Sequence, residues 1–500
     1  GAAPPVPLAD LAAGEVPADL LARALERWRP AMTGGAVAGL QWTVAGFGET
    51  SRAFLAESLG AVAPAGLSLA ASGGGTADVP AELVAGGPVA AVLVDGDLRL
   101  AAAGTVTEIA DGRVLAFGHP FLGMGPIEVP MATAEVVTVL SSEYSSFKIS
   151  NLGPIVGAFE QDRQAAIAGR LGAEAPMIPL EVTVGGAEPR TYRMRVAGVP
   201  QMAPTLLGIS TLAGLDSASH AGGLQGLDLT ARFHLDGHGE LEVAQSFDGE
   251  TAAMSSASYL MAMAAYLMQN ELAAVGIEKV EVELAPAGPP RTARLVGAHA
   301  ERSVVRPGDS VAVHLDFAAW RGDTFRHVVE LTVPEDAPRG AYHLFVGDGP
   351  SVDAARLMIE RSEPVDIGQA LDLLRSLHSR RELHVLGVAA GAGLSVAGEV
   401  LPNLPGSVRS LWSAAASDSA APLSLAIVQQ QGEPMRVPIE GLVRIDLEVE
   451  RRQPLTSATN GGGEEAGAEG DGGEIAGAAP AAPAGAAATA APAVGAGPAS

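Results

Sequence analysis

Residues 87–120 read GPVAAVLVDGDLRLAAAGTVTEIADGRVLAFGHP, and this stretch decides the fold class. It contains three apolar runs separated by the pairs Asp95-Gly96 and Asp111-Gly112. An Asp-Gly pair between short apolar runs favours a β-hairpin turn, because both residues tolerate the positive φ that such turns need. The stretch therefore predicts an antiparallel β-meander.

Similar signals extend in both directions from this meander. Strand-like runs at 135–140, 155–159 and 181–184 predict that residues 87–199 form an antiparallel, barrel-like β domain. A hairpin pattern follows at 229–247, and alternating apolar and polar residues at 302–349 predict a small β-sandwich. Helices are predicted at 18–28, 255–275 and 367–378.

These patterns divide the chain into six segments. They are an N-terminal α/β segment (1–86), the β domain (87–220), a hairpin plus helix connector (221–285), a small β-sandwich (286–350), a helix plus C-terminal β-rich domain (351–456) and an Ala/Gly/Pro tail (457–500). The tail is predicted to be disordered, because it has too little bulky apolar surface to offset the entropy of ordering. The expected fold class is mainly β and multidomain, with a barrel followed by β-sandwich-like domains and a few helices.

Composition excludes several classes of function. The chain has no cysteine, which excludes disulfides, thiolate metal sites and a cysteine nucleophile. Its formal net charge is −26 and no basic patch is visible, so we expect no nucleic acid partner. The longest apolar helical run, 257–268, is well short of the roughly 20 residues that a membrane span needs, so no transmembrane segment is predicted.

The histidines do not predict a metal site. His234 and His238 are four residues apart, which suits zinc on a helix, but the turn pair Asp236-Gly237 lies between them. The remaining candidates fall in predicted strands or beside a helix end and suggest no ligand set: His314, His327, His343, His378 and His384. The GMGPIE stretch at 123–128 is a weak nucleotide signal, so we expect no cofactor.

His119 differs from the other histidines because of its setting. The predicted strand ends at Phe117, Gly118 lets the backbone turn, and Pro120 stiffens the exit. This arrangement suits a general base, which has to be rigid and reachable, but the spacing alone favours a structural histidine. Further along, Asp162-Arg163 is predicted to form an internal ion pair.

No serine in the chain has the surroundings of a nucleophile. The serines of 141–146 follow His119 by about 25 residues, but no oxyanion-forming glycine lies beside them. The serines of 255–258 open a predicted helix, where serine is expected as a cap.

One segment resembles a known family. GDLRLAAAGTVTEIADGRVLAFGHPFLGMGPIEVPMATAEVVTVL (96–140), followed by SSFKISNLGPIVGAFEQDRQAAIAGRLG (145–172), resembles the SpoIVB-type serine peptidase domain, especially of large secreted bacterial members that carry β-sandwich domains. The resemblance implies a trypsin-like β-barrel endopeptidase (a hydrolase) with His119 as general base and a protein or peptide substrate. It also implies a secreted, periplasmic or cell-envelope location.

The chain departs from this family at the nucleophile. The family's Gly-x-Ser-Gly-x-Pro motif occurs nowhere in the 500 residues. We expect that the chain is an N-terminally truncated fragment whose serine lies outside it, and that the chain alone is close to inert. The alternative is a non-catalytic peptide-binding or scaffold protein with a decayed peptidase domain. A carbohydrate-binding or envelope structural protein is a third class, based on fold analogy alone.

Overall fold

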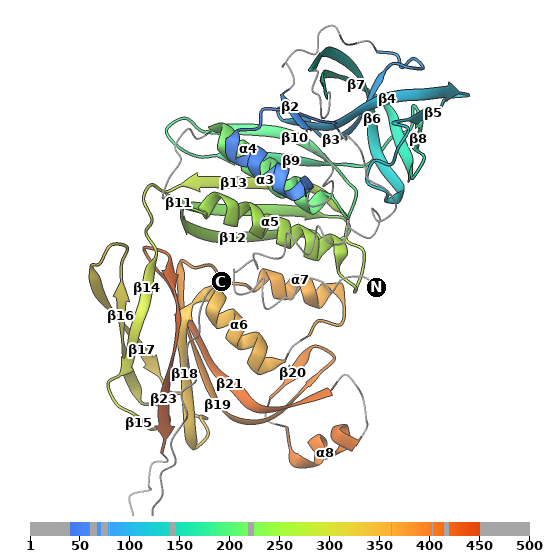
Figure 1. Ribbon diagram of the computed structural model, residues 1–500. Helices are drawn as coiled ribbons and strands as arrows, with labels where there is room; N and C mark the ends of the chain where they lie inside the picture. Colours follow the sequence, from blue (N-terminus) through green and yellow to red (C-terminus); the bar gives the residue numbers. More distant parts are fainter. Residues whose placement is uncertain are drawn as a thin grey trace, which may run out of the picture. The chain divides into compact units, whose positions relative to one another are not determined.

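The computed structural model describes residues 41–60, 68–71, 79, 81–140, 147–218, 225–361, 363–402, 404–414 and 420–450 (Figure 1). Strands make up 53% of it and helices 19%, so the predicted mainly β, multidomain class is confirmed. The predicted helix at 18–28, the serines of 141–146 and the tail at 457–500 lie outside the described residues.

Six antiparallel strands close into a ring. In ring order they are β3 (Pro88–Gly96), β4 (Arg99–Ala110), β5 (Arg113–Ala116), β8 (Ala166–Leu171), β7 (Phe147–Arg163) and β6 (Gly125–Leu140), which pairs with β3 again. The turn between β4 and β5 has Asp111 at φ 52° and Gly112 at φ 74°, the left-handed values that an Asp-Gly hairpin turn needs. Local turn chemistry therefore produced the meander that begins the barrel.

Strand β3 is buried on both faces, which explains its nearly continuous apolar sequence. Val89, Ala91 and Leu93 belong to the main hydrophobic core. Ala90 and Val92 belong to a second, smaller cluster formed largely by alanines of neighbouring strands. A strand covered on both sides needs apolar residues at successive positions rather than at alternate ones.

The barrel strands belong to a larger sheet of 13 strands. Beyond the second half of β3, the sheet continues through β10 (Arg190–Ala197), β9 (Met177–Val184), β13 (Ile277–Pro286), β11 (Gln225–Leu235) and β12 (Gly239–Gly249). On the β4 side it adds β1 (Gln41–Ala45) and β2 (Ser68–Ala71). The predicted segments 87–220 and 221–285 thus share one sheet, because β13 pairs with β9 in parallel.

Helices α4 (Ala203–Ala218) and α5 (Ala252–Gln269) pack against this sheet, and α3 (Glu49–Gly60) packs against α4 (Figure 1). The predicted helix at 255–275 is α5, and it ends at 269 because Asn270 is extended. Helix α4 was not predicted, since it is buried almost all round and its sequence has no helical periodicity. At Gly208 the two helices approach closely: an added Cβ would lie 2.9 Å from the backbone oxygen of Ala257.

The rest of the chain forms two further sheets. One has the order β17 (Thr324–Thr332), β16 (Ser310–Ala318), β14 (Ala293–Ala300) and β22 (Ile439–Glu440). The other has β15 (Val304–Val305), β23 (Leu442–Val449), β18 (Gly340–Asp348), β19 (Glu382–Val396) and β20 (Glu399–Leu401), with β21 (Ala420–Pro434) also paired to β19. They share one hydrophobic core, so the boundary predicted at 350 and 351 falls within a single sandwich.

Three short helices accompany the sandwich sequence. Helix α6 (Gly349–Glu360) packs against β18, β19 and β21, and α8 (Gly406–Ala414) contacts β19. Helix α7 (Ile367–Arg375) ends three residues before the predicted end, and its apolar face joins the core of the first sheet. Among the described residues, no helix combines the length and apolar character needed to cross a bilayer.

Candidate functional site

His119 lies in the loop between β5 and β6, directly after a sharp change of backbone direction. Strand β5 ends at Ala116, and the next two residues have left-handed φ angles, 75° at Phe117 and 72° at Gly118. Gly118 adopts such an angle at little cost, whereas for a bulky residue such as Phe117 it is an outlier. The surrounding contacts therefore have to hold Phe117 in place.

Those contacts come from β4 and the main core. The Phe117 N–H donates to the Thr105 carbonyl at 2.9 Å. The Phe117 ring lies over Gly104, where an added Cβ would collide with it, and forms edge-on contacts with Phe121 and Phe159. Gly104 and Thr105 of β4 thus provide the surface on which Phe117, two residues before His119, packs.

A buried carboxylate holds the other end of the loop. Asp162, only 1% exposed, accepts backbone N–H groups from Phe121 at 2.8 Å, Leu122 at 2.7 Å and Met124 at 3.1 Å. The predicted Asp162-Arg163 ion pair is wrong: the Arg163 Nε–H donates to Gln161 at 3.0 Å instead. Asp162 is the second-last residue of β7 and is paired with Gly125 at the start of β6, so its side chain lies beside the loop that leads into β6.

The hydrogen bond of the imidazole determines which nitrogen is free. His119 Nδ1 lies 2.8 Å from the Pro120 carbonyl oxygen. A carbonyl oxygen can only accept, so Nδ1 carries a proton, and in the neutral ring Nε2 is the nitrogen with the lone pair. The ring is half-buried and lies against Phe117, with ring centroids 5.7 Å apart. A neutral imidazole with a free Nε2 is the protonation state of a general base.

Within the described parts of the chain, Pro120 is the only hydrogen-bond partner of the His119 ring. No described hydroxyl or carboxylate is bonded to it, so a complete Ser-His-Asp arrangement is not seen among these residues. In such a triad a carboxylate holds the Nδ1 proton, and here a backbone carbonyl takes that place.

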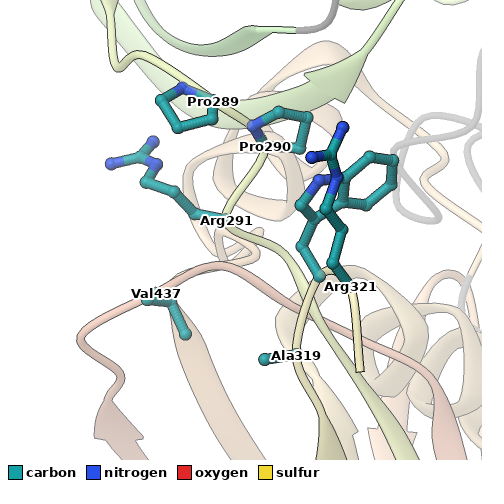
Figure 2. Close-up of a pocket in the computed structure, with 7 residues that line it drawn as sticks. Pro289, Pro290, Arg291, Ala319, Arg321 and Val437 are labelled. Atoms are coloured by element: carbon teal, nitrogen blue, oxygen red, sulfur yellow. The ribbon is translucent and has the colours of Figure 1, made fainter. Parts of the chain in front are cut away.

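Two open cavities lie elsewhere on the described surface. The larger, about 910 Å³, is formed by β3, β7 and the residues that lead into β9. The smaller, about 520 Å³, is shown in Figure 2. Its lining residues are Pro289, Pro290, Arg291, Ala319, Trp320, Arg321 and Val437. Neither cavity includes the loop that carries His119.

Three of the other histidines, His234, His327 and His343, lie on strands beside carboxylates. His234 lies on β11, 3.2 Å from Glu281 and 3.3 Å from Glu240, and the turn predicted at Asp236-Gly237 is present. Lys279 and then His234 donate hydrogen bonds to Glu281, and these lower the pKa of its carboxyl group to about 2. His327 pairs with Glu433 and His343 with Asp446.

His378 and His384, which suggested nothing specific in the sequence, lie together. Their ring centroids are 3.9 Å apart. The sequence does not predict this contact, because His378 follows helix α7 whereas His384 lies within strand β19, and no regular spacing relates the two.

Comparison with known proteins adds no relative: no family model matches the chain, and neither a curated protein nor a solved structure matches it significantly.

Proposed function

We propose that this chain is the histidine-bearing part of a secreted serine endopeptidase of the SpoIVB type, with His119 as the general base. The single observation that carries the proposal is the His119 imidazole itself. It is half-buried, its Nδ1–H donates a hydrogen bond to the Pro120 carbonyl, and its Nε2 is free to accept a proton. The nucleophilic serine is proposed to come from sequence outside the described residues.

The proposed chemistry follows from the free nitrogen. Nε2 takes the proton of the serine hydroxyl as its oxygen attacks the peptide carbonyl carbon, and the resulting imidazolium returns the proton to the leaving amine. Water then hydrolyses the acyl-enzyme with the same base. The Pro120 carbonyl keeps the ring oriented and faces the positive charge that forms on it. A positioned general base contributes about 10²- to 10⁴-fold to the rate.

The loop restraints support a catalytic assignment for this histidine. Phe117 is held in an unfavourable backbone conformation. Asp162 accepts three backbone N–H groups of the same loop with its two carboxylate oxygens. Backbone strain of this kind costs about 1 to 3 kcal/mol and is concentrated at functional sites. The six-stranded antiparallel ring also agrees with the barrel that the family resemblance implies.

The experiment uses the protein expressed from its complete natural reading frame and a fluorophosphonate probe, which labels activated serines. We expect one labelled serine in the natural protein and loss of labelling in His119→Ala. His343→Ala is the matched control, since that histidine lies on β18 in an ion pair with Asp446. Equal labelling of His119→Ala and the natural protein would refute the general-base role.

Absence of labelling in the natural protein would refute the peptidase proposal and favour the second candidate, a peptide-binding protein. The larger cavity favours that candidate. Its wall combines the exposed Ile155 (38%) with the charged side chains of Asp95 and Arg195, so it offers both apolar and polar contacts to a peptide. Fluorescent peptides of random sequence would then bind saturably, and Ile155→Glu would weaken that binding.

A further inference from the structure

A cluster of two imidazoles and a carboxylate lies where β19 begins. His378 follows the end of α7, while Glu382 and His384 are the first and third residues of β19 and so face the same side of the strand. One potential ligand atom from each lies within 4.8 Å of the other two. Among the described residues, no other group of three or more such side chains meets this condition.

A fourth residue, Asp353, fixes the position of His378 by two hydrogen bonds. Asp353, on α6, has 0% exposure, and it accepts the backbone N–H of His378 at 2.7 Å and the ring Nδ1–H at 2.9 Å. This bond places a proton on Nδ1, so in the neutral ring Nε2 is the nitrogen that can bind a metal. Metal-bound histidines usually donate the other ring N–H to a carboxylate in this way, which fixes the tautomer and makes the ligand more basic.

His384 supplies an independent observation. Its side chain is buried, with Nε2 2.9 Å from the Glu382 carboxylate, and its Nδ1 is buried with no hydrogen-bond partner. Leaving a buried polar atom unpaired is costly, and native proteins rarely do so without a bound water or ion. This nitrogen has a lone pair that a bound water or ion would satisfy.

We infer that His378, Glu382 and His384 bind one zinc ion, with Asp353 as a positioning residue. Two imidazoles and one carboxylate are a common set of three protein ligands for zinc. Tetrahedral bonds of about 2.0 to 2.1 Å place ligand atoms about 3.3 Å apart, so the cluster has to contract on binding. Glu382 can make that movement, because 40% of its side chain is exposed.

The exposure of Glu382 also leaves a fourth coordination position open to water. The ion would connect β19 to the segment after α7, and through Asp353 to α6. An ion that binds the folded chain only stabilises it by mass action, so a hundredfold excess of zinc over its Kd should raise the Tm by about 3 °C. The proposal concerns binding alone and is independent of the peptidase assignment.

The test uses the full chain stripped with a chelator and then titrated with cobalt(II), a spectroscopic substitute for zinc. We expect one equivalent of tetrahedral cobalt, seen as visible absorption bands that stoichiometric zinc abolishes. Glu382→Gln should lose these bands. This variant keeps an oxygen that can accept from His384, so its fold should be retained, as circular dichroism will check.

Three further variants test the other residues of the site and provide a control. His378→Gln should also lose the bands, and Asp353→Asn should weaken affinity about 10- to 100-fold. His327→Gln is the matched control, because it removes a histidine from another His-Glu pair, with Glu433, that has no third ligand. No tetrahedral bands in the natural chain, or bands that persist in Glu382→Gln and His378→Gln, would overturn the assignment. Equal loss in His327→Gln would do the same.

Discussion

Replacement of Asp162 by alanine should release the loop that carries His119. The variant removes the acceptor of three N–H groups, and two of them, from Phe121 and Leu122, belong to buried residues that water cannot reach. Each buried donor left unpaired costs about 1 to 3 kcal/mol, so opening of the loop should become easier by about 2 to 6 kcal/mol. The half-buried Met124 N–H can turn to water.

Asp162→Asn should have a smaller effect of the same kind. The amide keeps one acceptor oxygen but presents an NH₂ group to at least one of the loop donors. We expect a cost of about 1 to 3 kcal/mol, from one unpaired buried N–H. The free energy of loop opening should therefore be highest in the natural protein, lower in Asp162→Asn and lowest in Asp162→Ala.

Amide hydrogen exchange measures this directly. Every 1.4 kcal/mol is a factor of ten, so the amides of Phe121 and Leu122 should exchange at least about 20 times faster in Asp162→Ala. Asp97→Asn is the control: Asp97 is exposed and accepts a single bond, from the Arg193 N–H, so the change should cost less than about 1 kcal/mol. Unchanged protection of Phe121 and Leu122 in Asp162→Ala would refute the role given to this carboxylate.

Three other predictions concern packing and titration. Gly208→Ala should lower the free energy of unfolding in urea by about 1 to 3 kcal/mol, because the new methyl group would press on Ala257; an unchanged urea midpoint would contradict the helix contact. Burial raises the pKa of Tyr342 to about 12, so its contribution to stability is complete below pH 10.0 and is lost as the pH rises toward 12. Tyrosinate absorbance should follow this loss, and Tyr342→Phe should reduce it, the remainder coming from Tyr266, whose pKa burial also raises to about 12. The hydrogen bond from Lys279 lowers the pKa of Glu281, so its contribution is present above pH 4.5 and is lost as the pH falls toward 2. Acid titrations of stability should be flatter in Glu281→Gln, and identical curves for both proteins would disprove the effect.

Turn chemistry made part of the fold readable from the sequence. The Asp-Gly pairs between β4 and β5 and in the hairpin of β11 and β12 mark real turns, because φ preference is a property of two or three adjacent residues. The pair Asp95-Gly96 does not: it ends β3, and the chain turns at Asp97 and Leu98 instead. The position of His119 at a strand end followed from the same local reasoning. The mainly β class followed from the number of such turns and the alternating runs between them.

The helix between β10 and β11 could not be found in this way. In α4 nearly every side chain is buried, so the sequence lacks the apolar and polar alternation that reveals a surface helix. Its glycines also lower helix propensity, and Gly208 is explained only by the neighbouring helix α5. Tertiary packing here outweighed local preference.

What the sequence by itself determined is the set of hairpins, the β class and the local setting of His119. Tertiary structure alone decided that β13 pairs in parallel with β9, that Asp162 binds a loop about 40 residues earlier, and that His378 meets His384. The physical reason is the range of the interactions involved. Turns depend on the conformational preferences of adjacent residues, whereas strand partners and buried polar contacts depend on which distant surfaces exclude water together.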